Sequence, residues 1–273
     1  MTINCKGTLV DVSSPKVMGI LNITPDSFYD GGKYKDETAI LHQVEKMLTE
    51  GATFIDVGAY SSRPGAAHIS EDEELKRILP VIDLLIQNFP EIIISVDTFR
   101  SKIASGTVHA GAAIINDISG GNMDDKMFAT VANLQVPYIL MHMLGTPQNM
   151  QKNPVYDDVV KDIISFFAKQ IFELHQLKLN DLIIDVGFGF GKTIAHNYEI
   201  LKNLALFKSL DAPILAGVSR KSMLYKTLDI SAQEALNATT SANTIALLNG
   251  ANILRVHDVK EAIEAVKIVE QVR

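Results

Sequence analysis

The feature that most constrains the fold is an alternation of short apolar runs with longer amphipathic stretches along the chain. The apolar runs are rich in Val and Ile, as parallel strands are when helices bury both faces of their sheet. We predict strands at residues 17–23, 53–58, 92–97, 113–118, 137–142, 182–186, 213–218 and 252–257. We predict helices between them at residues 36–50, 71–87, 100–109, 124–133, 156–177, 194–207 and 231–249, with a last one at 258–271.

This order of elements predicts the fold class. A strand followed by a helix, eight times over, indicates an α/β protein with a (β/α)₈ TIM barrel, and an open doubly wound sheet is the alternative. The 273 residues suit one such barrel, which takes about 250 residues. Because no Ser/Gly-rich linker or charge block divides the chain, we predict a single domain over residues 1–273. The first dozen residues are expected to form a short strand or hairpin that closes the bottom of the barrel.

Composition narrows the class of partner. The chain has 25 Lys and Arg against 32 Asp and Glu, a net charge of −7, which argues against a nucleic-acid partner. No apolar run reaches about 18 residues, so we expect no membrane span, and the N-terminal segment lacks the pattern of a signal peptide. Cys5 is the only cysteine, which excludes a disulfide within the chain and argues against a structural zinc site. We therefore expect a cytoplasmic protein.

Polar side chains come at the end of every predicted strand, after its apolar half. They are Asn22, Asp56, Asp97, Asn116, Asp117, His142, Asp185, Ser219, Arg220, Lys221, Arg255 and His257. A charge inside an apolar strand is costly unless it is paired or used, and barrel enzymes keep their active sites at the C-terminal ends of the strands. The joint pattern therefore predicts an active site at that end. A single Asp of this kind could equally cap the next helix, and we interpret His142 as a hydrogen-bonded core histidine.

The last strand shows which side chains face the pocket. Arg255 and His257 are two positions apart, so both point to the same side of the strand. Leu254 and Val256 then face the outer helices.

A glycine-rich segment, DVGFGFGKT at residues 185–193, follows the sixth predicted strand. A phosphate-binding Walker loop would need a glycine at position 186, which is Val186. The dinucleotide pattern GxGxxG fails as well, because position 192 is Lys192. We therefore do not predict a nucleotide site here.

Two loops that follow the first two strands combine Gly, Pro and Ser with an aromatic residue or Arg. They are TPDSFYDGG at 24–32 and AYSSRPGA at 59–66. Such loops suit a mobile lid over a site, and ordinary surface connection is the alternative.

Eight segments resemble the dihydropteroate synthase family, in family order and over nearly the whole chain. They are MGILNITPDSF (18–28), SSRPGA (61–66), SVDT (95–98), INDISGG (115–121), MHMLGTP (141–147), GFGFGK (187–192), GVSRKSM (217–223) and RVHDV (255–259). The resemblance implies a (β/α)₈ barrel that transfers the pterinylmethyl group of dihydropterin-CH₂-diphosphate to 4-aminobenzoate. Diphosphate leaves, and 7,8-dihydropteroate forms on the route to folate. The resemblance also implies Mg²⁺ and a homodimer.

The resemblance assigns roles to individual residues. The catalytic set would be Asp97, Lys221, Arg255 and His257. The pterin contacts would come from Asp97, Asn116, Asp185, Lys221 and Arg255, with Met141 and Gly217 also binding substrate. The diphosphate pocket would comprise Asn22, Ser62, Arg63, Arg255 and His257, with Asn22 as the Mg²⁺ ligand. The 4-aminobenzoate slot would comprise Phe28, Ser62, Arg63, Pro64, Phe190, Ser219 and Lys221.

The chain departs from the family pattern at a few positions. Ala59 and Tyr60 stand where the family commonly has Gly and Glu, Ser62 replaces a more common Thr, Val186 replaces Pro, and Tyr29 is bulkier than the usual residue. Two alternatives to the synthase are a pterin-binding methyltransferase and a non-catalytic pterin-binding paralogue. The loop sequences TPDSF and SRPG, with Lys221 and the pair Arg255 and His257, favour the synthase.

Overall fold

The computed structural model describes residues 1–23, 33–60, 68–147, 149–150 and 154–272, without the side chains of 33–36. Its strands are β1 (Thr2–Cys5), β2 (Thr8–Asp11), β3 (Lys16–Asn22), β4 (Phe54–Gly58), β5 (Ile94–Asp97), β6 (Ile114–Asp117), β7 (Tyr138–Met141), β8 (Leu182–Asp185), β9 (Ile214–Ala216) and β10 (Ile253–Val256). Its helices are α2 (Lys33–Thr49), α3 (Glu71–Asn88), α4 (Ser101–His109), α5 (Met127–Leu134), α6 (Val159–Gln176), α7 (Ile194–Lys202), the 3₁₀ helix η1 (Leu204–Leu210), α8 (Ser222–Leu228), α9 (Leu236–Leu248) and α10 (Val259–Val269).

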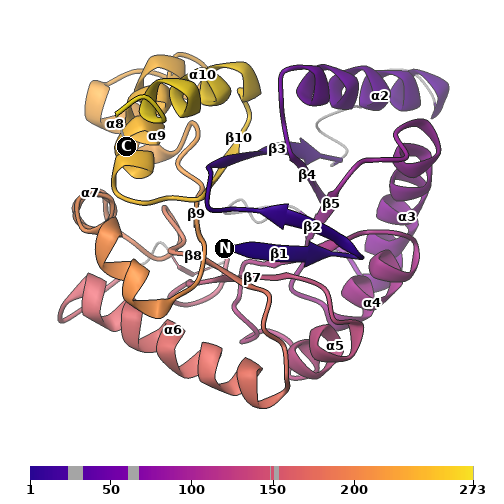
Figure 1. The fold of residues 1–273 in the computed structure, drawn as a ribbon, viewed down its shortest axis with the longest axis horizontal. Helices are drawn as coiled ribbons and strands as arrows, with labels where there is room; N and C mark the ends of the chain where they lie inside the picture. Colours follow the sequence, from indigo (N-terminus) through magenta and orange to yellow (C-terminus); the bar gives the residue numbers. More distant parts are fainter. Residues whose placement is uncertain (24–32, 61–67, 148, 151–153, 273) are drawn as a thin grey trace.

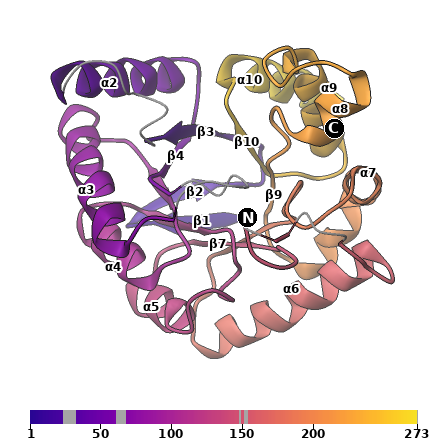
Figure 2. The ribbon, with the colours of Figure 1, turned by 180° about the vertical axis from the view of Figure 1, so that it is seen from behind.

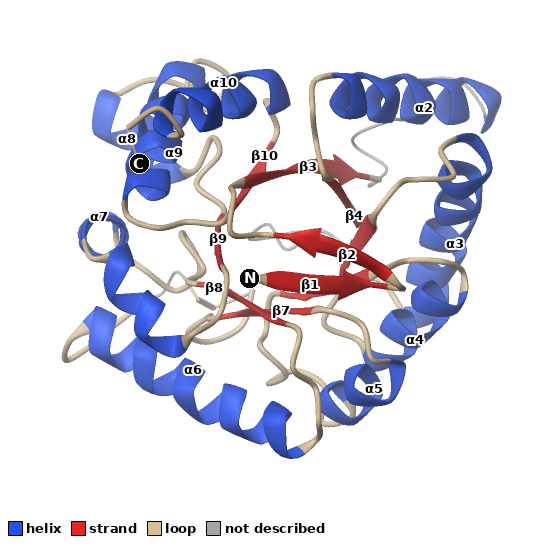
Figure 3. Cartoon of the chain, viewed as in Figure 1, coloured by secondary structure: helices blue, strands red, loops and turns tan. Residues whose placement is uncertain are grey.

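Strands β3 to β10 close into a barrel, and each pairs in parallel with its neighbours. The helices form a ring around the strands, as Figures 1 and 3 show. The predicted TIM barrel is therefore confirmed, and the open sheet is excluded because β10 pairs with both β3 and β9.

The first two strands form an antiparallel hairpin that lies across one mouth of the barrel, which Figures 1 and 2 show from opposite sides. The hairpin contacts the bottom of the barrel, where the strands begin. Lys6 Nζ donates to the carbonyl of Val108 at the end of α4, and the amide of Asn252, just before β10, donates to the carbonyl of Val12. Ile3, Cys5, Val10 and Val12 are buried against the inward side chains of the strands. The predicted hairpin closure is thus confirmed.

The strands bury apolar side chains on both faces, which explains why their sequences are continuous hydrophobic runs. Inward residues such as Phe54, Ile183 and Ile253 pack inside the barrel, and outward residues such as Leu254 and Val256 pack against the helices. Because the side chains alternate, Asp56, Asn116 and Arg255 meet on the inward side, as predicted for Arg255, whereas Asp117 faces outward. The bottom of the barrel is therefore filled by apolar side chains and its C-terminal mouth by polar ones.

Two predicted helices near the C-terminus need correction, and one helix was missed. The helix predicted at 194–207 is α7 followed by η1, because the chain leaves α-helical geometry at Asn203. The helix predicted at 231–249 begins only at Leu236 in α9, after a turn in which Glu234 accepts hydrogen bonds from the amide and hydroxyl of Ser231. Helix α8 was not predicted, because its seven residues are too few to show a helical period.

Among the described residues, no helix combines the length and apolar character that a membrane crossing requires.

Candidate active site

The strand register brings the first polar side chains together. Asn22 on β3 pairs with Gly58 on β4, Gly58 pairs with Asp97 on β5, and Asp97 pairs with Asn116 on β6. These residues therefore stand at one level around the C-terminal mouth. Gly58 lies close to both side chains, since a Cβ at Gly58 would be in van der Waals contact with Asn22 Oδ1 at 3.6 Å and with Asp97 Cβ at 3.5 Å.

Asp56 is the hub below this level. Its fully buried carboxylate accepts the hydroxyl of Ser95 at 2.6 Å, the amide of Asn116 at 3.0 Å and Nε of Arg255 at 2.6 Å. The sequence pattern identified Asp56 as a strand-end residue but assigned it no role. Its three bonds hold the side chains of β5, β6 and β10 in fixed orientations.

Arg255 links Asp56 to Asp97. Its Nη2 donates to Asp97 Oδ2 at 2.9 Å, and the Asp97 side chain is 18% exposed at the mouth. Burial raises the pKa of Asp97 to about 7, against the lowering effect of the Arg255 charge. Asp56 and Asp97 in turn raise the pKa of Arg255, so Arg255 stays a cation.

Asn116 carries an unsatisfied acceptor. Its Nδ2 is bound to Asp56, whereas its buried Oδ1 has no hydrogen-bond partner among the described residues. A buried carbonyl oxygen without a partner costs free energy, so this position favours a ligand with an N–H group.

Asp185 on β8 and Lys221 after β9 both lie beside Gly217. A Cβ at Gly217 would stand 3.9 Å from Asp185 Oδ2 and 3.8 Å from Lys221 Nζ. Asp185 Oδ1 accepts the amide N–H of Gly187 at 2.8 Å, and Lys221 Nζ donates to the carbonyl of Phe188. Burial raises the pKa of Asp185 and lowers the pKa of Lys221 to about 8.

The rim next to Lys221 combines an aromatic wall with a polar pair. Phe190 lies with its ring centroid 4.8 Å from Lys221 Nζ, and it packs against the cluster that contains Met141. Ser219 Oγ accepts the backbone N–H of His257 at 3.2 Å and lies 3.0 Å from His257 Nδ1. The tautomer of His257 decides which of the two groups donates in the Ser219–Nδ1 contact.

The C-terminal mouth thus gathers carboxylate acceptors, an unsatisfied carbonyl oxygen and two cationic side chains. The profile of the family described as pterin binding enzyme matches residues 18–257. The chain is 43% identical over 272 residues to the dihydropteroate synthase of Escherichia coli K12, covering 99% of this chain and 96% of that protein. The chain belongs to the dihydropteroate synthase family.

Solved structures agree over the whole chain. The Yersinia pestis dihydropteroate synthase in complex with a sulfonamide drug superposes with a TM-score of 0.93 at 44% identity, covering 100% of this chain and 99% of that one. The Xanthomonas albilineans dihydropteroate synthase in complex with 7,8-dihydropteroate superposes with a TM-score of 0.89 at 34% identity, covering 100% and 98% of the two chains. The activity of this family member is that of a dihydropteroate synthase, a transferase of folate biosynthesis. The methyltransferase and non-catalytic alternatives find no support in these relatives.

Asp117 and Arg220 point away from the site, although the sequence pattern placed all polar strand-end residues in it. Asp117 turns outward, where it accepts the hydroxyls of Tyr138 and Ser119 and two backbone N–H groups. Arg220 forms two bonds with Asp258, at 2.8 and 2.9 Å. Both therefore belong to the turns that support the site.

Lys192 of the synthase is a buried residue for which the motif analysis found no role. Its Nζ lies 3.0 Å from His142 Nδ1, and it donates to the carbonyls of His142 and Phe190 at 3.2 and 3.0 Å. Burial lowers the pKa of Lys192 to about 7, and burial with the nearby lysine charge lowers the pKa of His142 to about 2. His142 is thus a neutral, hydrogen-bonded interior histidine, as interpreted from the sequence. Gly187 packs tightly against His142, because a Cβ at position 187 would overlap the carbonyl oxygen of His142.

The predicted site residues Phe28, Ser62, Arg63 and Pro64 lie outside the described residues, as do Tyr29 and most of both predicted lid loops. Among the described residues, no group of three or more His, Cys, Asp or Glu side chains is arranged to hold a metal ion. Asn22 offers a side-chain oxygen at the mouth, which suits Mg²⁺ because this ion prefers oxygen ligands and takes the rest from water and substrate phosphates.

Proposed function

We propose that Asp185, Asn116 and Asp97 bind the amino-pyrimidinone edge of the dihydropterin. The observation that carries this assignment is the buried, unpartnered Asn116 Oδ1, which stands at the same level as Asp97. The carboxylate of Asp185 can accept two parallel N–H groups of the pterin edge, one at each oxygen, and such charge-assisted bonds are strong. Lys221 donates to the acceptors of the ring, Arg255 lies against its face, and Met141 and Gly217 shape the pocket.

The reaction then requires one bond to break and one to form. The C–O bond between the pterinyl methylene and diphosphate breaks, and both of its electrons leave with diphosphate. The amine nitrogen of 4-aminobenzoate supplies the electron pair of the new C–N bond and loses a proton to solvent. The ionised carboxylate of Asp97 stabilises the pterinylmethyl cation that develops between these events.

The leaving diphosphate needs cationic and donor groups at the mouth. We assign these to Arg255, His257, Ser62 and Arg63, and we assign Asn22 as the protein ligand of Mg²⁺. Bound Mg²⁺ would supply neutralisation of the diphosphate charge. Fixed charges of this kind lower the barrier because they need no reorganisation as the C–O bond breaks.

The acceptor slot is assigned to the neighbouring rim. Phe190, Ser219 and Lys221 would form one wall for 4-aminobenzoate, and Phe28, Ser62, Arg63 and Pro64 the other. The 4.8 Å approach of Lys221 to the Phe190 ring supports the first wall, since it places a cation and an aromatic face side by side.

We also propose that the chain forms a homodimer. The exposed face of α9 carries Ile245 and Leu248, which are 45% and 53% exposed. A second copy would remove this apolar surface from water. The cytoplasmic location stays a prediction.

The deciding experiment measures diphosphate release by the purified protein with dihydropterin diphosphate, 4-aminobenzoate and Mg²⁺. We expect release that needs both substrates and stops when Mg²⁺ is chelated. A folded sample that releases no diphosphate under these conditions contradicts the proposal. Tight binding of methyl-tetrahydrofolate without such release would favour the methyltransferase instead.

A further inference from the structure

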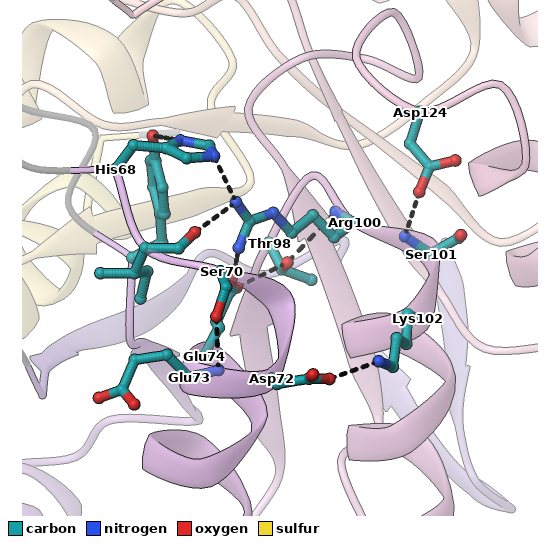
Figure 4. A network of polar contacts seen from close by, with 12 residues as sticks. His68, Ser70, Asp72, Glu73, Glu74, Thr98, Arg100, Ser101, Lys102 and Asp124 are labelled. Carbon is teal, nitrogen blue, oxygen red and sulfur yellow. Dashed lines mark hydrogen bonds and ion pairs between the residues drawn. The ribbon is translucent and has the colours of Figure 1, made fainter.

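A polar network outside the pocket connects α3, β5 and the segment before α3, as Figure 4 shows. Its centre is Glu74, which is fully buried. Glu74 accepts Arg100 Nη1 at 2.6 Å and the hydroxyl of Thr98 at 2.9 Å. Arg100 is itself only 6% exposed, so this ion pair holds the guanidinium in one orientation. A buried ion pair often adds little to stability, so the other contacts of the Arg100 guanidinium indicate its role.

The other side of the Arg100 guanidinium binds the chain just before α3. Its Nη2 donates to the carbonyl of Ile69 at 2.7 Å and lies 3.2 Å from His68 Nε2. Arginine has only donors, so Nε2 must accept and His68 carries its proton on Nδ1. That Nδ1 lies 3.2 Å from the hydroxyl oxygen of Tyr60 and therefore donates to it.

Tyr60 is fixed by its ring as well as by its hydroxyl. The ring packs edge-on against Phe99, with centroids 5.0 Å apart and planes at 89°. The Arg100 guanidinium lies 5.3 Å from the Tyr60 ring and 5.2 Å from the Phe99 ring.

These contacts have a direct relation to the proposed site. Tyr60 and His68 bound residues 61–67, which carry Ser62, Arg63 and Pro64. The network attaches both of these boundary residues to Phe99 and Arg100, next to Asp97 in the chain. The backbone N–H of Thr98 also donates to the carbonyl of Asn116 at 3.0 Å. One network thus joins the ends of segment 61–67 to the strand ends that present Asp97 and Asn116.

We propose that Tyr60, His68 and Arg100 are positioning residues, which hold the ends of segment 61–67 at a fixed place relative to Asp97. The effect on catalysis rests on the proposed function, because it assumes that Ser62 and Arg63 bind diphosphate and 4-aminobenzoate. The rings of Tyr60 and Phe99 pack against the apolar cluster that contains Met141, but the hydrogen bonds of Tyr60, His68 and Arg100 go to none of the proposed pterin ligands Asp97, Asn116 and Asp185. Tyr60→Phe keeps the ring and removes only the hydroxyl. Loss of these hydrogen bonds should therefore weaken acceptor and diphosphate binding and leave pterin binding unchanged.

The test compares Tyr60→Phe with Tyr198→Phe in the full chain. Both changes remove one hydroxyl that makes one hydrogen bond, because Tyr198 donates to the carbonyl of Met223 at 3.0 Å on the other side of the barrel. For Tyr60→Phe we expect a rise of about fivefold to tenfold in the KM for 4-aminobenzoate and a lower kcat, in line with a hydrogen bond worth about 1 kcal/mol. The affinity for a pterin analogue and the midpoint of thermal unfolding should stay at their wild-type values. Tyr198→Phe should leave all kinetic parameters unchanged.

Two variants of His68 test the same bond from the other side. His68→Leu can neither accept from Arg100 nor donate to Tyr60, so it should match the effect of Tyr60→Phe. His68→Gln offers both an acceptor and a donor and should recover part of the lost activity. Combining Tyr60→Phe with His68→Leu should cost less than the sum of the two single changes, since both remove the same bond.

A measurement that needs no turnover separates this inference from the proposed function. Amide hydrogen exchange of the peptide 59–70 should be several-fold faster in Tyr60→Phe and His68→Leu than in the wild type and in Tyr198→Phe. Unchanged exchange and unchanged KM in both variants would overturn the positioning role, as would an equal loss of pterin affinity and thermal stability. If the wild type releases no diphosphate, the proposed function fails, and the exchange result alone decides whether the network holds the segment.

Discussion

Arg255 Nε lies 2.6 Å from Asp56 Oδ2, although the two residues are 199 positions apart in the chain. They come from β10 and β4, which are separated in the barrel by β3. The pair is buried on the Asp56 side and partly exposed on the Arg255 side. Asp56 therefore orients the cation that we propose as a substrate contact.

Asp56→Asn should reduce both stability and activity. The change removes the charge that balances Arg255 and disturbs the bonds to Ser95 and Asn116. Breaking a buried pair by changing one partner costs about 3–5 kcal/mol, so we expect a loss near the lower figure, since Asp97 still pairs with Arg255. Chemical denaturation measures this loss, and Asp11→Asn, on the exposed hairpin, is the control. An unfolding free energy within about 0.5 kcal/mol of the wild type would contradict the role of Asp56 as a hub.

Asp97→Asn should reduce activity strongly and stability only slightly. We expect turnover to fall by about a hundredfold or more, because the carboxylate charge no longer stabilises the developing cation. The melting temperature should change by only a few degrees, since burial already disfavours the charge and Asn can still accept from Arg255. Normal turnover per folded molecule in this variant would exclude an electrostatic role for Asp97.

The pH dependence of kcat/KM should report the ionisation of Asp97. Its pKa is raised to about 7, so the carboxylate is charged above that pH and protonated below it. We expect kcat/KM to rise with pH up to about 7, by at most tenfold per pH unit, and then to level off. Asp97→Asn should abolish this limb. A wild-type profile that is flat between pH 5 and 8 would contradict the assignment.

Lys192→Met should change how stability depends on pH. The pKa of Lys192 falls from 10.5 to about 7 on folding, so between these values the unfolded chain binds a proton that the folded chain does not. The unfolding free energy of the wild type therefore gains up to about 1.4 kcal/mol per pH unit over that window from this residue. The melting temperature of the wild type minus that of Lys192→Met should therefore be larger at pH 9 than at pH 7. An unchanged difference would mean that Lys192 stays charged in the folded protein.

Asn22→Ala should raise the Mg²⁺ concentration needed for half-maximal diphosphate release. The side-chain oxygen is the proposed protein ligand, and its loss leaves the ion to water and substrate. We expect an increase of about tenfold, as for the loss of a contact worth about 1.4 kcal/mol. Affinity for a pterin analogue without Mg²⁺ should not change. If the Mg²⁺ requirement is the same in both proteins, Asn22 is not a ligand.

Sequence patterns predicted the barrel well because its signal is local. Buried parallel strands need apolar runs, and each run here ends in a polar group such as Asp185 or Arg255. The same local reasoning failed at α8, which is too short to show a period, and at residues 194–210, where α7 passes into a 3₁₀ turn. Alternation along β10 correctly separated inward Arg255 from outward Leu254 and Val256.

The sequence by itself determined the alternating strands and helices, the polar strand ends and the ordered motifs of the family. Only the tertiary structure decided which of those polar groups share one pocket. Asp117 and Arg220 look like pocket residues in the sequence, yet they bind Tyr138 and Asp258 outside it. The sequence assigned no role to Asp56, Lys192 or Glu74, yet each organises several groups around it. The reason is physical: hydrogen bonds between residues far apart in the chain depend on strand register and side-chain direction, which exist only once the barrel has closed.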